Sequence, residues 1–234
     1  MNRRRDTEDQ SVQKPAAELL ASLGWHSVVA FNAEDFGPAS LLGRSNKSES
    51  VLKRHLRAAL VRLNPGVPEL AVDQAMDTLL TLDAAKTLVQ TNEDKYKLLR
   101  DGVPVQVRWP DGRESQEKLT VIDFDRPDDP TRNEFICVQE LWLEGGPGPL
   151  RPDLLGFVNG LPLLFTAFTR QDNDLKVAFD ETYTSDRQYL PGPCSARWPS
   201  ACWTRANRPA STLQHPAQAP PRTRRAHPAH GPPK

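Results

Sequence analysis

The stretch RPDLLGFVNGLPLLFTAFT, residues 151–169, contains two apolar runs that meet at Asn159 and Gly160. An Asn-Gly pair between two such runs is the strongest short-range indication of a tight β-hairpin. Side chains alternate between the two faces of a strand, so an acid at the start of one strand can face a side chain on the next. We therefore predict a hairpin with Asp153 at the beginning of its first strand.

A hairpin of this kind can carry a metal-dependent nuclease site. Such a site needs carboxylates on one or two hard cations, and a lysine nearby that helps to position or activate the attacking water. In the nuclease motif written PD-(D/E)xK, the second acid and the lysine lie two residues apart and project to the same side of the second strand. Pro152 and Asp153 supply the first half of this motif. Without this context, Asp153 would be a plain turn residue after a proline.

The chain before the hairpin begins with helical periodicity. A helix starting near Pro15 and ending at Gly24 should precede a short strand at 27–31. Ser48 can cap the next helix. Its expected apolar face is Val51, Leu52, Leu56, Ala59, Leu60 and Leu63. Two more helices are expected, one from about Glu69 to Leu82 that buries Leu70, Met76, Leu79 and Leu80, and one from about Asn92 that ends before Asp101.

The periodicity then changes to that of strands. VPVQVRW and KLTVIDF flank the turn residues Pro110, Asp111 and Gly112, which predicts a first hairpin. FICVQELWL should form another strand, and a last helix is expected from Asp174 to about Ser185. This order predicts an α/β domain in which a mixed sheet has flanking helices.

Residues 191–234 differ in composition from the rest. They hold ten of the 22 prolines and seven of the 30 basic residues, and they contain no Asp or Glu. This tail cannot build a core. Residues 1–190 are left with a formal charge of −7, which is unlike a general nucleic-acid coat protein. We expect the Pro-, Ala- and Arg-rich tail to be disordered and to be out-of-frame translation after a frameshift near Pro191, with a basic DNA-binding arm as the alternative.

Other features exclude several classes of protein. Cys137, Cys194 and Cys202 give neither a disulfide framework nor paired metal-ligand spacing, so we expect a protein of the reducing cytoplasm. The sequence has no apolar run near the roughly 18 residues of a membrane span. None of the 13 glycines precedes a lysine, so the GxxxxGK[ST] loop is missing and we predict no ATP site.

The hairpin and five other segments together resemble the N-terminal nuclease segment of the restriction subunit of type I restriction enzymes. The matches follow the order of the family from about Leu42 to Pro191. The five segments are LGRSNKSESVLKRHLRAALVRLNP, NEDKYKLLRDGVPVQV, VIDFDRP, NEFICVQELW and LKVAFDETYTSDRQYLP. Six matches in sequence are far more specific than one short motif.

This resemblance implies a restriction-endonuclease-like PD-(D/E)xK core that cuts unmethylated foreign double-stranded DNA, with Mg²⁺ held between carboxylates. It divides the chain into a leading helix and strand (1–40), a nuclease-like domain (41–190) and the tail (191–234). Family members continue into ATP-dependent translocase domains and assemble with methylation and specificity subunits. We expect this chain to be a truncated member that stops before the motor.

The hairpin departs from the family at two positions. The family's pattern here is approximately RPDLVGFVNGLPLVFIELK, which puts Ala167 at the second acid and Thr169 at the lysine. Alanine offers no metal ligand, and a neutral hydroxyl does not replace an ammonium. Because Asp153 is the only catalytic side chain left in the hairpin, we predict that the chain does not cleave DNA. A non-catalytic remnant that docks to the motor or modification subunits, or a pseudogene product that barely folds, are the alternatives.

Relocated chemistry is a further alternative. Asp174 and Lys176 have the DxK spacing, with Asp172 nearby. Projection of both side chains to one side needs a strand, whereas this stretch resembles the start of a helix. A capped and solvated helix end is therefore favoured.

Two sets of residues before the hairpin are also candidates. Glu49 matches an acid of the family and could approach the metal as a catalytic residue, or could equally oppose the helix dipole or pair with Lys53. Lys53, Arg54 and Arg57 make a basic helix face that could contact DNA phosphates. A solvated face is the favoured alternative for these three residues.

Overall fold

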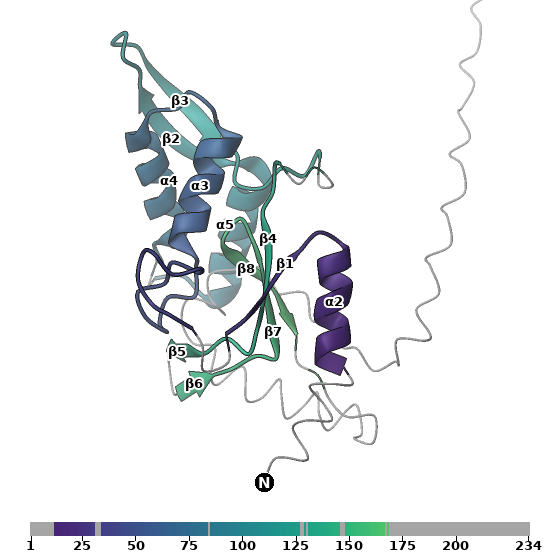
Figure 1. Ribbon diagram of the computed structural model, residues 1–234. Coiled ribbons are helices and arrows are strands. Elements are labelled where there is room, and N and C mark those ends of the chain that lie inside the picture. Colours follow the sequence, from purple (N-terminus) through teal and green to yellow (C-terminus); the bar gives the residue numbers. More distant parts are fainter. Residues whose placement is uncertain are drawn as a thin grey trace, which may run out of the picture.

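A computed structural model gives the fold of the chain (Figure 1). It describes residues 12–30, 34–83, 85–126, 129, 131–145, 148–166 and 168. The expected helix at 174–185, the DxK alternative within it and the tail lie outside these residues. The proposed domain boundaries stay predictions.

Four strands form a mixed sheet in the order β1-β4-β7-β8. Strand β1 (His26–Val29) runs parallel to β4 (Phe135–Gln139), and β7 (Leu154–Val158) runs antiparallel to β4 and to β8 (Leu161–Thr166). The β7–β8 hairpin is the predicted one, and its turn residues Asn159 and Gly160 have φ of 50° and 80°. The mixed sheet and its helices confirm the predicted α/β class.

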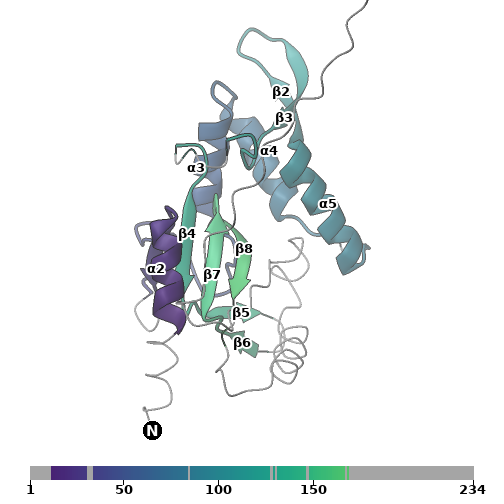
Figure 2. The same cartoon turned by 90° about the vertical axis from the view of Figure 1, so that its right-hand side faces the viewer.

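Different elements pack against the two faces of the sheet. Helix α2 (Lys14–Ser22) lies against one face, where Ala17 packs with Cys137 and Leu154 (Figure 2). The other face presents Leu155 and Phe157, which pack against residues of the 34–52 loop and of the segment after β4. The small strands β5 (Leu143–Gly145) and β6 (Gly148–Leu150) pair with each other beside this second face.

A second core lies at the far end of the hairpin. It is built from α3 (Lys53–Leu63), α4 (Glu69–Leu80), α5 (Leu88–Asp101) and the antiparallel pair β2 (Val103–Arg108) and β3 (Glu114–Leu119). Leu161 of β8 reaches this core, so the hairpin joins the two parts of the molecule. None of the helices in the described ranges is both long enough and apolar enough to cross a membrane.

Several predicted helix details are wrong. Ser48 does not cap α3, which begins at Lys53, because Leu52 instead donates its N–H to the carbonyl of Gly160 over 2.9 Å. In α4, Leu70 is 76% exposed, and the buried positions are Ala71, Val72, Ala75 and Leu79. Helix α5 begins earlier than predicted, because Thr87 and Gln90 form a reciprocal capping box.

Two strand predictions also need correction. The second strand of the first hairpin is Glu114–Leu119, earlier than KLTVIDF, whose Val121 and Ile122 are buried without being in a strand. The expected strand over 135–143 is split in two, because Glu140 has a φ of 53°. A positive φ in a non-glycine residue interrupts the ladder there.

A buried network fixes the turn of the hairpin. The side-chain oxygen of Asn159 accepts hydrogen bonds from Arg62 (3.0 Å) and from the N–H of Glu134 (2.8 Å). Its amide nitrogen donates to Asn133 and to the carbonyl of Val121. Asn159 has no exposed surface, so these bonds satisfy a polar group that would otherwise destabilise the core. The Asn-Gly pair therefore locks α3 to the hairpin.

Candidate functional site

Asp153 lies where β4 ends and β7 begins. Its Oδ2 accepts a hydrogen bond from the N–H of Phe168 over 2.7 Å. Its carbonyl oxygen accepts from Gln13 Nε2 (2.9 Å) and from the N–H of Glu140 (3.1 Å). Three separate segments therefore hold the backbone and the carboxylate of Asp153.

The register of the hairpin agrees with the motif comparison. Leu154 pairs with Thr166, and these two residues directly follow Asp153 and directly precede Ala167 in the chain. Asp153 has the same strand parity as Leu155 and Phe157, so alternation assigns its side chain to the second face of the sheet. The motif comparison predicts that the second acid and the lysine of the family correspond to positions 167 and 169. Both residues lie outside the described part of the chain.

Glu49 lies in the loop that covers this second face. One carboxylate oxygen accepts from Lys53 Nζ (2.8 Å), and the other accepts from the N–H of Ser45 (2.7 Å). Partial burial alone would raise the pKa of Glu49, but these hydrogen bonds outweigh it and hold the pKa below its ordinary value. Glu49 therefore forms the ion pair with Lys53, which was one of the predicted alternatives. Its catalytic role stays a prediction.

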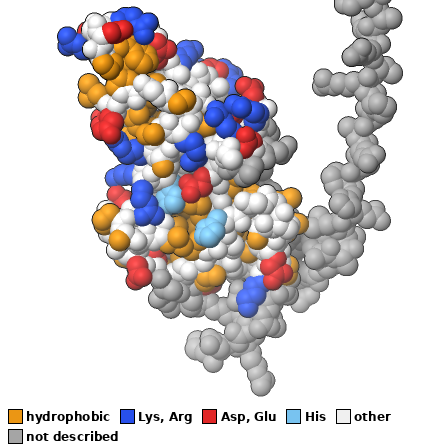
Figure 3. Space-filling view, turned by 45° about the horizontal axis from the view of Figure 1, so that its top comes forward, with side chains coloured by type: hydrophobic (Ala, Val, Ile, Leu, Met, Phe, Trp, Pro, Cys, Tyr) orange, Lys and Arg blue, Asp and Glu red, His pale blue; other side chains and the backbone are white. Residues whose placement is uncertain are grey.

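The basic face of α3 is occupied by contacts within the protein. Arg54 donates to the carbonyls of Pro38 and Leu41, and Arg57 pairs with Asp73 of α4. Lys53 pairs with Glu49, so all three cations of this helix face have partners within the chain. Figure 3 shows acidic and basic side chains interspersed over the visible face of the molecule. A role of the three residues in DNA binding stays a prediction.

Sequence reasoning missed the residues that hold Asp153 and the covering loop. Gln13 is buried although it lies near the start of α2, and nothing in its neighbourhood in the sequence signals a contact with Asp153. Arg44 has no exposed surface although it lies in a Gly- and Ser-containing loop. A charged residue in such a loop is usually solvated, so only the fold reveals this one.

Comparisons with known proteins show the family to which this chain belongs. The family model described as "Type I restriction enzyme R protein N terminus" matches residues 5–190. This chain belongs to that family. It is also 32% identical over 184 residues to the type I restriction enzyme HindI endonuclease subunit of Haemophilus influenzae, an alignment that covers 76% of this chain. The chain spans 17% of the length of that relative.

The Mg²⁺ that such a nuclease uses does not fit the donors of this hairpin. Among the described residues, no three His, Cys, Asp or Glu side chains gather in a way that could hold a metal ion. Asp153 already accepts a main-chain hydrogen bond, and the motif positions 167 and 169 carry a methyl group and a neutral hydroxyl. A hard divalent cation prefers several oxygen ligands, and one carboxylate is a poor substitute for the family's set.

Proposed function

We propose that this chain is the nuclease-like domain of a type I restriction subunit that binds double-stranded DNA without hydrolysing it. Membership of the family supports the DNA-binding part of the proposal. The observation that supports the non-catalytic part is in the sequence, where Ala167 and Thr169 stand at the positions at which the family's motif has its second acid and its lysine. Mg²⁺ would serve the intact family site, and ATP would serve only the longer members of the family.

A cleavage assay tests this proposal. Supercoiled plasmid is incubated with the purified 234-residue chain and Mg²⁺, and nicked and linear products are separated on a gel. We expect the products to stay at the level of a reaction without protein. Mg²⁺-dependent cleavage that Asp153→Ala abolishes would show that the site is active. Cleavage that survives Asp153→Ala would point to a contaminating nuclease.

A second candidate function is docking to the methylation and specificity subunits or to the motor of the same system. The lost catalytic side chains favour it, because a domain that no longer cuts can still keep its binding surfaces. Pull-down of those subunits by the tagged chain tests this candidate. Retention on the column, with no DNA cleavage by the recovered complex, is the expected result.

A further inference from the structure

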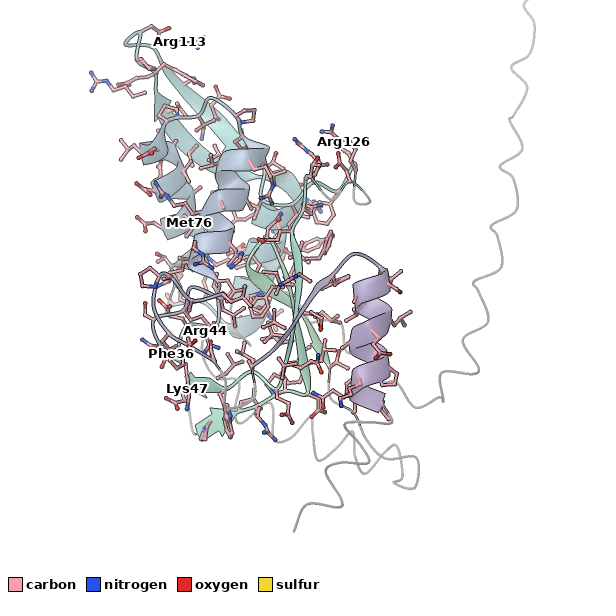
Figure 4. The ribbon with its side chains drawn as sticks, in the orientation of Figure 1. Phe36, Arg44, Lys47, Met76, Arg113 and Arg126 are labelled. Carbon is pink, nitrogen blue, oxygen red and sulfur yellow. The ribbon has the colours of Figure 1, made fainter. Side chains whose placement is uncertain are left out.

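A fully buried arginine holds two segments of the chain together. Arg44 donates from its Nη2 to the carbonyl of Lys47 (2.8 Å) and to the carbonyl of Trp142 (2.9 Å), and its Nη1 lies 3.1 Å from a carboxylate oxygen of Glu34. Burying a guanidinium destabilises a fold unless it is paired and hydrogen-bonded. These bonds fix the backbone of Lys47 and that of Trp142 against each other. Figure 4 shows Arg44, Phe36 and Lys47 in the lower left part of the molecule.

Two cations lie near the indole ring of Trp142. Lys47 Nζ lies 5.6 Å from the ring centroid, and the guanidinium carbon of Arg151 lies 5.2 Å from it. Both distances are within the range of a cation–π interaction. The two side chains come from parts of the chain that are distant in sequence. Trp142 therefore serves as a common support for them.

Both cations form ion pairs with acidic neighbours. Lys47 Nζ lies 3.3 Å from Glu144, and Arg151 lies 3.7 Å from Glu140. The side chain of Lys47 is 39% exposed, and that of Glu144 is 51% exposed. The exposed Lys47–Glu144 pair contributes only about 0–1 kcal/mol, so a phosphate group can take the place of the Glu144 carboxylate. The Arg151–Glu140 pair is less accessible, because its side chains are only 22% and 17% exposed. The cations of α3 are bound differently, because Arg54 is used to hold main-chain carbonyls.

The two cations, Lys47 and Arg151, are linked to Asp153 through the chain around them. Arg151 precedes Asp153 by two residues, and Glu140 contacts both of them, through its carboxylate to Arg151 and through its N–H to the carbonyl of Asp153. Leu141 and Leu143 flank Trp142 and pack on the same sheet face as Leu155. The pair of cations therefore adjoins the face to which alternation assigns the carboxylate of Asp153.

We propose that Lys47 and Arg151, supported by Trp142, contact the phosphates of double-stranded DNA next to Asp153. The inference rests on the proposed DNA-binding function and adds the surface that performs it. Two fixed cations suit a contact with the backbone, which positions a duplex without reading its sequence.

Fluorescence anisotropy with a labelled 20-base-pair duplex tests the inference. Affinity of the full chain is measured over a series of salt concentrations for wild type, Lys47→Ala, Arg151→Ala and the matched control Lys97→Ala. Lys97 is an exposed, ion-paired lysine on α5. Each lost phosphate contact lowers the slope of log K against log salt by about 0.9 and weakens binding about fivefold at moderate salt. We expect this loss for Lys47→Ala and Arg151→Ala, and no change for Lys97→Ala.

The outcomes separate the two proposals. If wild type binds and both site variants bind equally well, the surface is wrong while DNA binding stands. If wild type does not bind the duplex, DNA binding and the surface both fail. A thermal melt of each variant identifies unfolding, and Lys47→Arg, which keeps the charge, should bind like wild type.

Discussion

The main-chain N–H of Phe168 donates a hydrogen bond to the carboxylate of Asp153 across the open end of the β7–β8 hairpin. The side chain of Phe168 packs at the same time against the α2 side of the sheet, with Ala17 and Leu154. The acid that would begin a nuclease motif is thus used, in this chain, to hold the main chain at Phe168, just beyond the end of β8.

Asp153→Ala should therefore lower stability. A hydrogen bond to a charged acceptor contributes about 1.5–3 kcal/mol, so we expect the free energy of unfolding to fall by about 2 kcal/mol. Asp153→Asn keeps one oxygen acceptor and should lose less. Urea unfolding followed by circular dichroism measures both changes. Equal stability of wild type and Asp153→Ala would show that the carboxylate does not hold the main chain at Phe168.

Gly160→Ala should be among the most destabilising changes in the hairpin. A Cβ at this position would lie 2.5 Å from the carbonyl oxygen of Leu52 and 2.7 Å from the N of Leu56, in a backbone with φ of 80°. Left-handed strain and overpacking together predict a loss of about 3 kcal/mol. Gly112→Ala is the matched control, because Gly112 has φ of 85° but no neighbour within 4 Å. It should lose only about 1 kcal/mol, and a similar loss for both would contradict the close approach.

Asp123 should make stability depend on pH. The hydrogen bond from Arg132 (2.7 Å), together with Arg126, holds the pKa of this carboxyl below its ordinary value of 3.8. A group whose pKa is lowered by folding stabilises the protein above the unfolded pKa, and that stabilisation is lost as pH falls through the folded pKa. Asp123→Asn should thus lower the Tm at pH 7, and the difference from wild type should shrink below about pH 4. A difference that stays constant with pH would contradict this cause.

Arg44→Met should destabilise the protein far more than a surface substitution of the same kind. The methionine fills much of the volume but leaves Glu34 and two carbonyls without their donor, so we expect a loss of about 3 kcal/mol or more. Arg57→Met is the control, because its pair with Asp73 is exposed and contributes about 1 kcal/mol or less. Chemical denaturation of both variants gives the comparison, and equal losses would show that Arg44 is not a structural anchor.

Local signals in the sequence predicted the local parts of the fold. The Asn-Gly pair and the alternating runs around it gave the hairpin correctly, because a two-residue turn depends mainly on its own residues. The start of α3 was wrong, because a contact between Leu52 and Gly160 sets it. The split after Gln139 was missed because it depends on the positive φ of Glu140.

In the candidate site, too, local features were predictable and contacts between distant residues were not. Asp153 and its place at the start of a strand were predictable, since the motif is contiguous. Its anchors were not predictable, because Gln13 lies far away in the sequence, directly before α2, and Glu140 acts through its main chain. The main chains of Lys47 and Trp142 are joined through the buried Arg44, whose role no local pattern indicates.

Isothermal titration calorimetry of Mg²⁺ binding tests whether the hairpin lacks a working metal site. The full chain is compared with the double variant Ala167→Glu/Thr169→Lys, each with and without Asp153→Ala. We predict weak Mg²⁺ binding by wild type that Asp153→Ala leaves unchanged. In the double variant we predict a gain of about tenfold or more that depends on Asp153. Wild-type binding as tight as that of the double variant, and lost in Asp153→Ala, would contradict the account.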